Sequence, residues 1–225
     1  MGQSTPEPTG GVVTFMDVLG WRGIYQRKPN PLSDLEELVS GLRDLHRPDS
    51  PIETQIKSIS DTIAVFSRGE EDEWPRLIEW HGQLAALAIT RGINYELPIR
   101  GATSVGEFQL LDDMFVGPAL DEAAGWYEKA DWIGVHLTPS AAFSFKPGLG
   151  SMWVEYKPPL TGAGGWRCPC VLWPFAWDFE EGDRASLQRV FRNLGPITPD
   201  ISNKYTNALR FFDDMQGEIG RVNDA

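Results

Sequence analysis

The chain has few cysteines, few histidines and no long apolar run, and each shortage excludes a class of protein. Only two cysteines, Cys168 and Cys170, occur in 225 residues, too few for the disulfide framework of a small secreted domain. No histidine lies near them in sequence, so a zinc-ligand pattern is absent too. We interpret both as reduced structural residues. His46, His81 and His136 are scattered without metal-ligand spacing and are interpreted as surface or packing residues.

Basic residues are also in short supply. The sequence has 20 Lys and Arg against 32 Asp and Glu, a net charge of −12 and a pI near 4.7. This charge repels a DNA or RNA backbone, so we expect no nucleic acid polymer as a partner. No apolar stretch reaches the ~20 residues that span a bilayer, and the polar start 1–11 lacks a basic segment followed by an apolar one. We therefore expect no membrane association and a cytoplasmic location.

What is present is enough apolar surface for one sizeable core, since 41% of residues are hydrophobic and 11% aromatic. We expect a flexible N-terminal tail over 1–11, a main domain over 12–150, and a C-terminal extension over 151–225 packed on that domain. The aromatic-rich stretch 166–179 has two interpretations, core packing between extension and main domain, or a subunit interface.

The apolar pattern predicts alternating strands and helices. Strands are expected at 12–15, as a hairpin within 56–66, and at 99–106, 133–137, 152–156 and 171–173. Helices are expected from a capping box at Ser33 and Glu36 to Pro48, and over 74–91, 117–129, 182–194 and 202–215. This order is typical of an α+β fold with a palm-like sheet, its helices packed on one face and the other face free for substrate.

Two aspartates stand where the chain turns off a hydrophobic strand. Asp17 follows the buried-strand pattern of 12–15, and Asp61 is expected at the tip of the hairpin. Either one alone could equally be a turn residue, because an Asp side chain bonds its own backbone. Mg²⁺ and Mn²⁺, however, are usually held by one or two carboxylates together with the phosphates of a substrate. The pair therefore indicates a two-metal site for a nucleoside triphosphate.

Four motifs follow each other between residues 12 and about 129. They are Phe15-Met16-Asp17-Val18-Leu19-Gly20-Trp21, Lys57-Ser58-Ile59-Ser60-Asp61-Thr62, Arg100-Gly101-Ala102-Thr103-Ser104-Val105-Gly106 and Phe115-Val116-Gly117-Pro118-Ala119-Leu120. In this order they resemble the catalytic domain of class III nucleotidyl cyclases, and the last resembles the helix start of the bacterial pyrimidine cyclases of Pycsar anti-phage defence. The resemblance implies that 12–150 is a cyclase catalytic domain. It also implies that UTP, or CTP, is converted to cyclic UMP, or cyclic CMP, and pyrophosphate, and that the product activates a separate effector.

The resemblance also implies how the triphosphate is held. Asp17 and Asp61 would bind two divalent ions, Mn²⁺ or Mg²⁺, for in-line attack of the ribose 3′-hydroxyl, and the backbone carbonyl of Val18 would complete one coordination sphere. Phe15 would lie under the triphosphate. The amides from Leu19 through Gly20 to Gly23, at a helix start, would cradle its phosphates.

Base recognition and charge neutralisation are less well defined. Lys57 would offer donors to a pyrimidine carbonyl; alternatively it is a solvated lysine at the end of a strand. Asp112 and Asp113 would form either the polar wall of the base pocket or a solvated acidic turn. Purine cyclases carry an Asn and, four residues on, an Arg along the helix after the Val-Gly motif. By count those positions here hold Asp121 and Gly125.

Charge developing on the phosphates must still be offset, since positioned cations supply much of the catalysis in phosphoryl transfer. Arg100 and Lys129 are candidates for this role, although Arg100 could equally be a strand-end surface residue. In the cyclase superfamily the active site forms between two catalytic domains, so the resemblance predicts a homodimer with two equivalent composite sites.

Three alternatives stay open. A diguanylate synthase is disfavoured because Ser60-Asp61-Thr62 stands where a Gly-Gly-Asp/Glu-Glu-Phe turn would be expected. A purine cyclase fits Lys57 as well as a pyrimidine cyclase does. A non-catalytic nucleotide-binding scaffold would account for the missing Asn and Arg, but has no need of two facing carboxylates.

Overall fold

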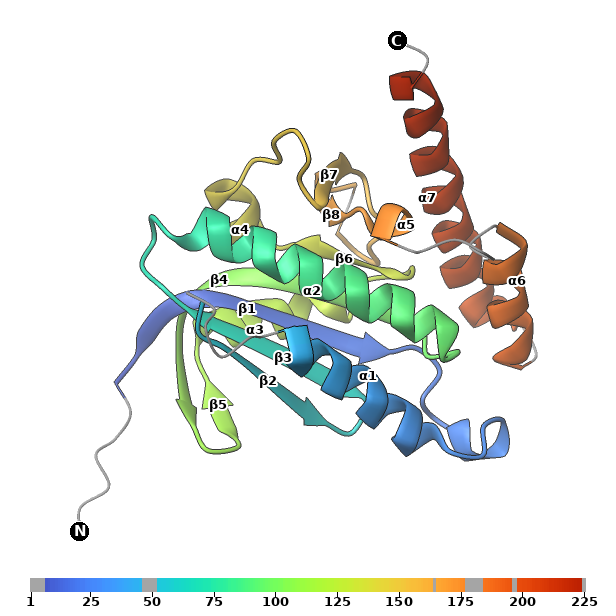
Figure 1. Ribbon diagram of the computed structural model, residues 1–225, viewed down its shortest axis with the longest axis horizontal. Coiled ribbons are helices and arrows are strands. Elements are labelled where there is room, and N and C mark those ends of the chain that lie inside the picture. The colour runs from blue at the N-terminus through green and yellow to red at the C-terminus, as the bar shows by residue number, and fades with distance from the viewer. Residues whose placement is uncertain (1–6, 46–51, 164, 177–183, 196–197, 224–225) are drawn as a thin grey trace.

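The computed structural model describes residues 7–45, 52–163, 165–176, 184–195 and 198–223 (Figure 1). Its eight strands are β1 (Thr9–Val18), β2 (Thr54–Ile59), β3 (Thr62–Arg68), β4 (Ile99–Leu111), β5 (Met114–Val116), β6 (Gly134–Leu137), β7 (Trp153–Tyr156) and β8 (Cys168–Val171). They form one sheet in the order β2-β3-β1-β4-β6-β8-β7, with β5 paired to the outer end of β4. The mixed α+β class predicted from the sequence is confirmed.

The helices follow the strands in chain order. They are η1 (Ile24–Gln26), α1 (Pro31–Leu45), α2 (Trp74–Asn94), α3 (Pro118–Tyr127), α4 (Pro139–Ser144), α5 (Trp173–Ala176), α6 (Arg184–Asn193) and α7 (Pro199–Asn223). None of the helices within the described ranges is long and apolar enough to cross a membrane.

β1 is an internal strand of the sheet, because both of its edges are paired. Its β-branched and aromatic residues favour an extended backbone, and it lies antiparallel to both β3 and β4. The register places Asp17 opposite Thr62 on one side and opposite Arg100 on the other. The last residues of β1 are therefore held from two sides.

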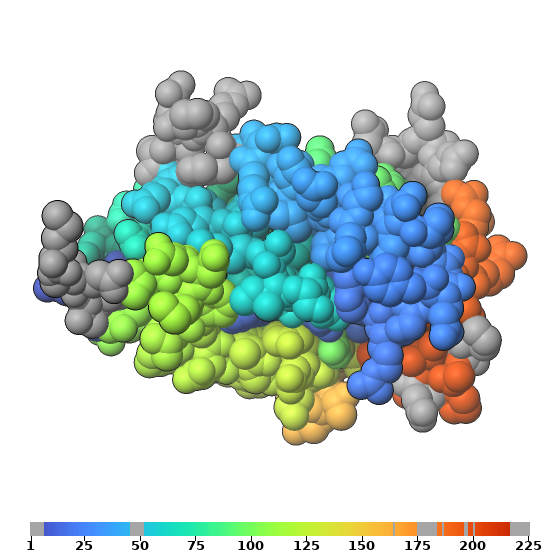
Figure 2. All heavy atoms as spheres, turned by 90° about the horizontal axis from the view of Figure 1, so that it is seen from below, coloured from blue at the N-terminus to red at the C-terminus, as the bar shows by residue number. Residues whose placement is uncertain are grey.

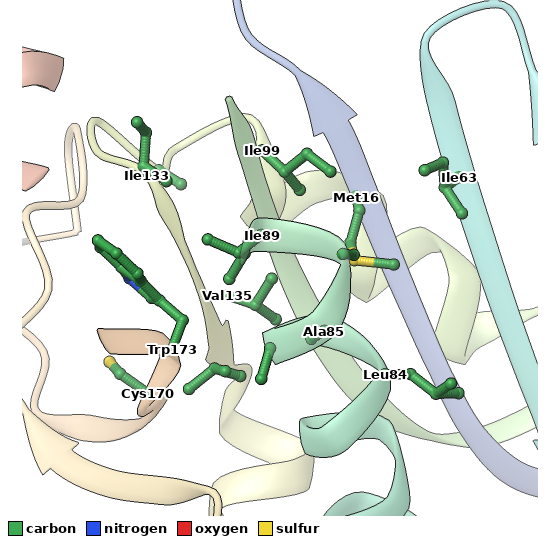
Figure 3. Packing of buried hydrophobic residues seen from close by; sticks show 14 of the residues in the cluster. Met16, Ile63, Leu84, Ala85, Ile89, Ile99, Ile133, Val135, Cys170 and Trp173 are labelled. Carbon is green, nitrogen blue, oxygen red and sulfur yellow. The ribbon is translucent and has the colours of Figure 1, made fainter. Parts of the chain in front are cut away.

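Alternate residues of β1 face two different cores, as the two-residue period of a strand requires. Val12 and Met16 point to the face covered by α1 and α2, where the larger core lies. Figure 3 shows Met16, Ile63 and Ile99 from the sheet meeting Ala85 and Ile89 from α2. The two long helices thus pack on one face, as predicted.

The opposite face is not left free along its whole length. Val13 and Phe15 point to it, and α3 packs over them with Ala119, Leu120 and Ala123. This smaller core also contains Phe66, Phe108 and Leu110 from β3 and β4. α3 therefore covers part of the face that was predicted to be free for substrate.

A chain of hydrogen bonds runs through the larger core between α2 and the sheet. His81 of α2 bonds the hydroxyl of Thr14 through Nδ1 at 2.7 Å and that of Ser67 through Nε2 at 3.0 Å. Thr14 bonds Thr103 at 2.7 Å, and Ser67 bonds Thr54 at 2.8 Å. Burial lowers the pKa of His81 to about 3, so the ring is neutral. This His81 chain links four adjacent strands to one helix.

The structure corrects several predicted boundaries. β1 begins at Thr9, so part of the expected tail belongs to the sheet. α1 begins at Pro31, whose fixed φ suits a first helical position, and the Asp34 N–H bonds the Asn30 carbonyl at 3.2 Å. The predicted capping box is therefore wrong, because Ser33 already lies inside the helix. The expected break at Pro48 falls outside the described residues.

The C-terminal part of the chain adds to the same sheet. β8 pairs with β6 at His136 and Cys170, and with β7 along its length. The predicted strand 171–173 is wrong, because β8 ends at Val171 and Trp173 begins α5. Trp173 is buried against Phe211 and Phe212 of α7, with centroids 6.1 Å apart, so it is a core residue. The rest of the aromatic stretch from residue 177 on lies outside the described residues.

The two described histidines and both cysteines have the structural roles that were predicted. His81 and His136 are buried, and burial lowers the pKa of His136 to about 4. Cys168 and Cys170 are free thiols in the core, and burial raises the pKa of Cys170. His46 lies outside the described residues.

Candidate active site

The fold brings the two predicted aspartates together. Asp17 is the second-last residue of β1, and Asp61 lies in the two-residue turn between β2 and β3. The Val18 N–H donates to the Asp61 carbonyl at 3.2 Å, which fastens the hairpin tip to the end of β1. Burial raises the pKa of Asp17, and the nearby charge of Asp61 raises it further. The pair therefore lies at the C-terminal end of β1, beside the turn that joins β2 and β3.

Arg100 is part of this pair's surroundings rather than a surface residue. Its Nε and Nη2 both donate to Oδ2 of Asp17 at 3.1 Å, and its Nη1 donates to the carbonyls of Glu128 and Ala130 at 3.2 Å. The side chains of Arg100 and Asp17 are only 18% and 15% exposed. Burial raises the pKa of Asp17, and the Arg100 charge opposes that rise. The strand-end surface interpretation of Arg100 is therefore wrong, and Asp17 is largely shielded from solvent together with it.

Phe15 is buried beneath the site instead of lining it. Its ring stacks on Tyr127 at 6.2 Å and meets Phe115 at 6.0 Å, and only 7% of the residue is exposed. Tyr127 in turn lies 5.7 Å beneath the guanidinium of Arg100. Sequence reasoning missed Tyr127, although its helical spacing from Leu120 was a usable signal.

The segment after β1 is a loop and not the start of a long helix. Gly20 and Gly23 have φ near 77° and 76°, the left-handed region that favours glycine. The Leu19 N–H donates to the Pro98 carbonyl at 2.8 Å, and the side chain of Arg27 bonds the Gly20 carbonyl. The predicted phosphate cradle is therefore wrong in two respects: the Leu19 amide is already used, and only the short η1 begins here.

Lys57 meets the acidic turn between β4 and β5. Its Nζ donates to the Asp112 carbonyl at 2.6 Å and pairs with the Asp113 carboxylate at 3.3 Å. Lys57 is not simply solvated, because its side chain is 25% exposed, whereas that of Asp113 is 98% exposed. Figure 2 shows the teal β2–β3 hairpin running beside the yellow-green segment that contains this turn. We call Lys57, Asp112 and Asp113 the Lys57 cluster.

A cavity of about 390 Å³ lies between α3 and the loop 161–163. Asp121, Glu122, Gly125 and Trp126 of α3 line it, together with Lys129 just beyond the end of the helix. A Cβ built on Gly125 would meet no atom within 4 Å. The space beside position 125 is therefore open, and we call this cavity the α3 pocket.

Asp17 and Asp61 suit a divalent cation. Among the described residues no three His, Cys, Asp or Glu side chains gather as a metal-binding group, so a cation here would take its remaining ligands from a substrate. Two carboxylates beside one guanidinium leave a net charge of about −1 at this end of β1. Hard carboxylate oxygens fit Mg²⁺ or Mn²⁺ completed by phosphate oxygens.

The fold is that of the catalytic core of class III nucleotidyl cyclases. One solved structure that shares it is the catalytic core of a rhodopsin-guanylyl cyclase with converted specificity, in complex with ATPαS. It is 14% identical, with a TM-score of 0.50 over 75% of this chain and 98% of that one. A bacterial light-regulated adenylyl cyclase is 14% identical, with a TM-score of 0.46 over 86% of this chain and 60% of that one. No family model and no curated protein sequence matches the chain.

Proposed function

We propose that the protein is a nucleotidyl cyclase that converts a pyrimidine triphosphate, UTP in preference to CTP, to its 3′,5′-cyclic monophosphate and pyrophosphate. The observation that carries the proposal is that Asp17, at the end of β1, and Asp61, in the β2–β3 turn, lie side by side on a cyclase-type sheet. The pyrimidine preference rests on the resemblance of 115–120 to the pyrimidine cyclases of anti-phage defence. In that setting the product would be a second messenger for a separate effector.

The reaction exchanges one P–O bond for another. The 3′-oxygen bonds the α-phosphorus, the bond to the bridging oxygen of pyrophosphate breaks, and the 3′-hydroxyl proton passes to water. Asp17, Asp61 and the Val18 carbonyl would hold two divalent ions, Mn²⁺ or Mg²⁺, which when bound would supply positive charge at the phosphates and acidify the 3′-hydroxyl.

Arg100 has a positioning role in this proposal. Its two hydrogen bonds to Oδ2 fix the orientation of the Asp17 carboxylate, and its charge opposes the effect of burial on the Asp17 pKa. A bound cation would oppose the effect of burial in the same way as Arg100 does, because a metal ligand must be ionised. Tyr127 and Phe15 form the apolar support beneath this ion pair.

The Lys57 cluster is the proposed base site. The Lys57 ammonium can donate to a uracil or cytosine carbonyl, and the exposed carboxylate of Asp113 can accept from a ring N–H or an exocyclic amine. Lys57 lies on β2, whereas Asp61 lies in the turn after that strand, and Lys57 contacts the β4–β5 turn instead of Asp61. We infer that each site is composite, with the aspartates from one subunit and the Lys57 cluster and α3 from the other.

A homodimer is the state this arrangement requires, and one surface beside the Lys57 cluster is suited to it. Met114 and Val116 point away from the core on β5 and are 64% and 60% exposed, and Ile59 and Leu111 nearby are exposed as well. Such apolar surface is typical of a protein contact. Sedimentation should give twice the chain mass, and an active monomer would contradict the composite site.

The purified protein should be incubated with each of the four ribonucleoside triphosphates and Mn²⁺, and the products resolved by mass. We expect cyclic UMP or cyclic CMP and pyrophosphate. Asp17→Asn and Asp61→Asn should remove product, whereas Asp213→Asn, which loses an exposed ion pair to Arg184 on α6, should not. Full activity in either site variant would refute the metal assignment.

A purine cyclase is the second candidate. The rhodopsin-guanylyl cyclase core was solved with ATPαS, and Lys57 can donate to an adenine ring nitrogen as readily as to a pyrimidine carbonyl. Cyclic AMP or cyclic GMP as the main product of the same incubation would favour it. A scaffold that binds nucleotide would yield no cyclic product with any triphosphate.

A further inference from the structure

The end of helix α6 lies beside the loop that follows β1. α6 ends at Asn193, and Gly195 follows with φ 103°, the left-handed conformation that commonly terminates a helix. Figure 2 shows orange atoms of α6 against the blue segment that follows β1. A direct contact joins the two, between Arg27 and Leu194, which are 167 residues apart in the chain.

Arg27 ties the loop to the end of this helix. Its Nη1 donates to the Leu194 carbonyl at 2.7 Å, and its Nη2 donates to the Gly20 carbonyl. A Cβ built on Gly20 would lie 3.4 Å from Nη2, and a Cβ built on Gly195 would lie 3.4 Å from the Cδ of Arg27. The last carbonyls of a helix carry partial negative charge, which a guanidinium stabilises. One side chain thus fixes Gly20 to the end of α6.

α6 is a rigid support because it is part of the larger core. Leu187, Val190 and Phe191 are buried there, and the Phe191 ring stacks on Tyr205 of α7 with centroids 4.4 Å apart. Burial raises the pKa of Tyr205, and the nearby charge of Arg27 opposes that rise. Arg27 therefore lies beside a helix pair that apolar packing already holds in place.

A second contact joins α6 to the loop between α2 and β4. The side-chain amide of Asn193 donates to the Glu96 carboxylate. Two residues further on, the Pro98 carbonyl accepts from the Leu19 N–H at 2.8 Å. The end of α6 therefore supports the peptide groups after β1 from two sides, through Arg27 on one side and through the α2–β4 loop on the other.

These contacts fix the direction of the Val18 carbonyl. Across a trans peptide, the carbonyl of one residue and the N–H of the next point in opposite directions. Because the Leu19 N–H points toward Pro98, the Val18 carbonyl points to the opposite side, toward β3. The Val18 N–H donates to the Asp61 carbonyl on that same side. The Val18 carbonyl thus faces the hairpin turn that carries Asp61.

We propose that Arg27 is a positioning residue: by tying Gly20 to the end of α6, it holds the Val18 carbonyl in the direction that serves the proposed cation site. This inference rests on the proposed function and deepens it, since it gives the C-terminal helices a role at the active site. Arg27 acts through the main chain and not on the substrate. Loss of a group that orients a metal ligand typically lowers metal affinity or activity by about 10-fold to 100-fold.

The first test is Arg27→Met, with Arg192→Met as the matched control. Arg192 is an exposed arginine in the last turn of α6, and its Nε bonds the Gln188 carbonyl within the same helix at 3.5 Å. We expect Arg27→Met to raise the Mn²⁺ concentration that gives half-maximal activity by about 10-fold to 100-fold, and saturating Mn²⁺ to restore activity. Arg192→Met should match the wild type.

The Mn²⁺ requirement separates positioning from stability. A substitution that merely reduced the folded fraction would lower activity at every Mn²⁺ concentration and leave the half-maximal concentration unchanged. That result in Arg27→Met would overturn the proposal.

Hydrogen exchange followed by NMR tests the same inference without any reaction. In Arg27→Met the Leu19 amide should exchange about 10-fold to 100-fold faster, because a charge-assisted hydrogen bond no longer closes the loop 20–27. The amides of 12–16 should keep their protection, because they lie in ladders with β3 and β4. Wild-type exchange at Leu19, or equal acceleration throughout β1, would overturn the proposal.

Arg27→Lys tests whether the guanidinium must bridge two carbonyls. A lysine keeps the charge but lacks the planar fork that reaches Leu194 and Gly20 together. Its Mn²⁺ requirement and its Leu19 exchange should therefore lie between those of the wild type and of Arg27→Met. Values equal to those of the wild type would show that charge alone is sufficient, and the bridging role would be refuted.

The proposed function and the role of Arg27 can fail separately. If the wild type forms no cyclic product with any triphosphate, the proposed function fails, and exchange at the Leu19 amide still decides whether Arg27 holds this loop. If the wild type is active and Arg27→Met changes neither the exchange nor the Mn²⁺ requirement, the proposed function stands and Arg27 has no positioning role.

Discussion

Protonation of His81 should limit the stability of the protein in acid. The ring is fully buried and its pKa falls from 6.5 in the unfolded chain to about 3 in the folded protein. The folded state therefore binds fewer protons, and stability present above the unfolded pKa is lost as the pH falls toward the folded value. Between about pH 7.5 and about pH 5 this group alone removes about 2 kcal/mol. His136, with a folded pKa of about 4, acts in the same direction and removes about 2 kcal/mol more.

His81→Gln keeps a polar side chain but removes the titration. At about pH 7.5 we expect this substitution to lower the free energy of unfolding by about 1 to 3 kcal/mol, because it alters two hydrogen bonds. The loss is limited because Thr14 and Ser67 keep their second partners, Thr103 and Thr54. Between about pH 7.5 and about pH 5 the variant should lose only about half as much stability as the wild type. The difference in free energy of unfolding between the wild type and His81→Gln should therefore become smaller in acid.

Urea unfolding followed by tryptophan fluorescence at both pH values gives the free energies needed. His136→Gln is the matched control, because it removes the other buried imidazole without touching the His81 chain. If His81→Gln loses as much stability on acidification as the wild type does, His81 is not a neutral buried group and the reasoning fails.

Two further predictions concern single positions. Gly82→Ala should destabilise the protein although alanine favours helices, because its Cβ would meet the Trp153 indole, which donates to the Ile78 carbonyl at 3.0 Å. Gly125→Ala, by contrast, should raise the free energy of unfolding by up to about 1 kcal/mol. Thermal unfolding compares the two variants, and equal effects would contradict the packing. Arg100→Met should lower the free energy of unfolding by about 3 kcal/mol, because it leaves the Asp17 carboxylate buried without its cation. Adding Asp17→Asn to this variant should restore part of that stability. If urea unfolding shows that the effects of the two substitutions simply add, the coupling is refuted.

The aspartate pair was predictable because its causes are local. A β-branched strand ending at Asp17 and a hairpin turning at Asp61 can be recognised from short stretches of sequence, and β1–β3 pairing then brings the two together. The contact of Arg100 with Asp17 was not predictable in this way. It depends on the β1–β4 register, which joins residues 83 apart in the chain.

The remaining differences also arise from tertiary structure. The spacing of Ala119, Leu120 and Ala123 indicates an apolar helix face but not which side of the sheet it covers. The six residues of α4 are too few to show a helical period. Trp173 continues an apolar run and was therefore interpreted as strand, but its burial against α7 is a contact that no local pattern reveals.

The internal place of β1 affects how the chain can fold as it is synthesised. β1 leaves the ribosome before both of its neighbours, β3 and β4, and β4 ends only at Leu111. At 5 to 20 residues per second, roughly ninety further residues take about 5 to 20 seconds to appear. At least one edge of β1 is open for that interval, so we expect slower translation or a lower growth temperature to alter the soluble yield.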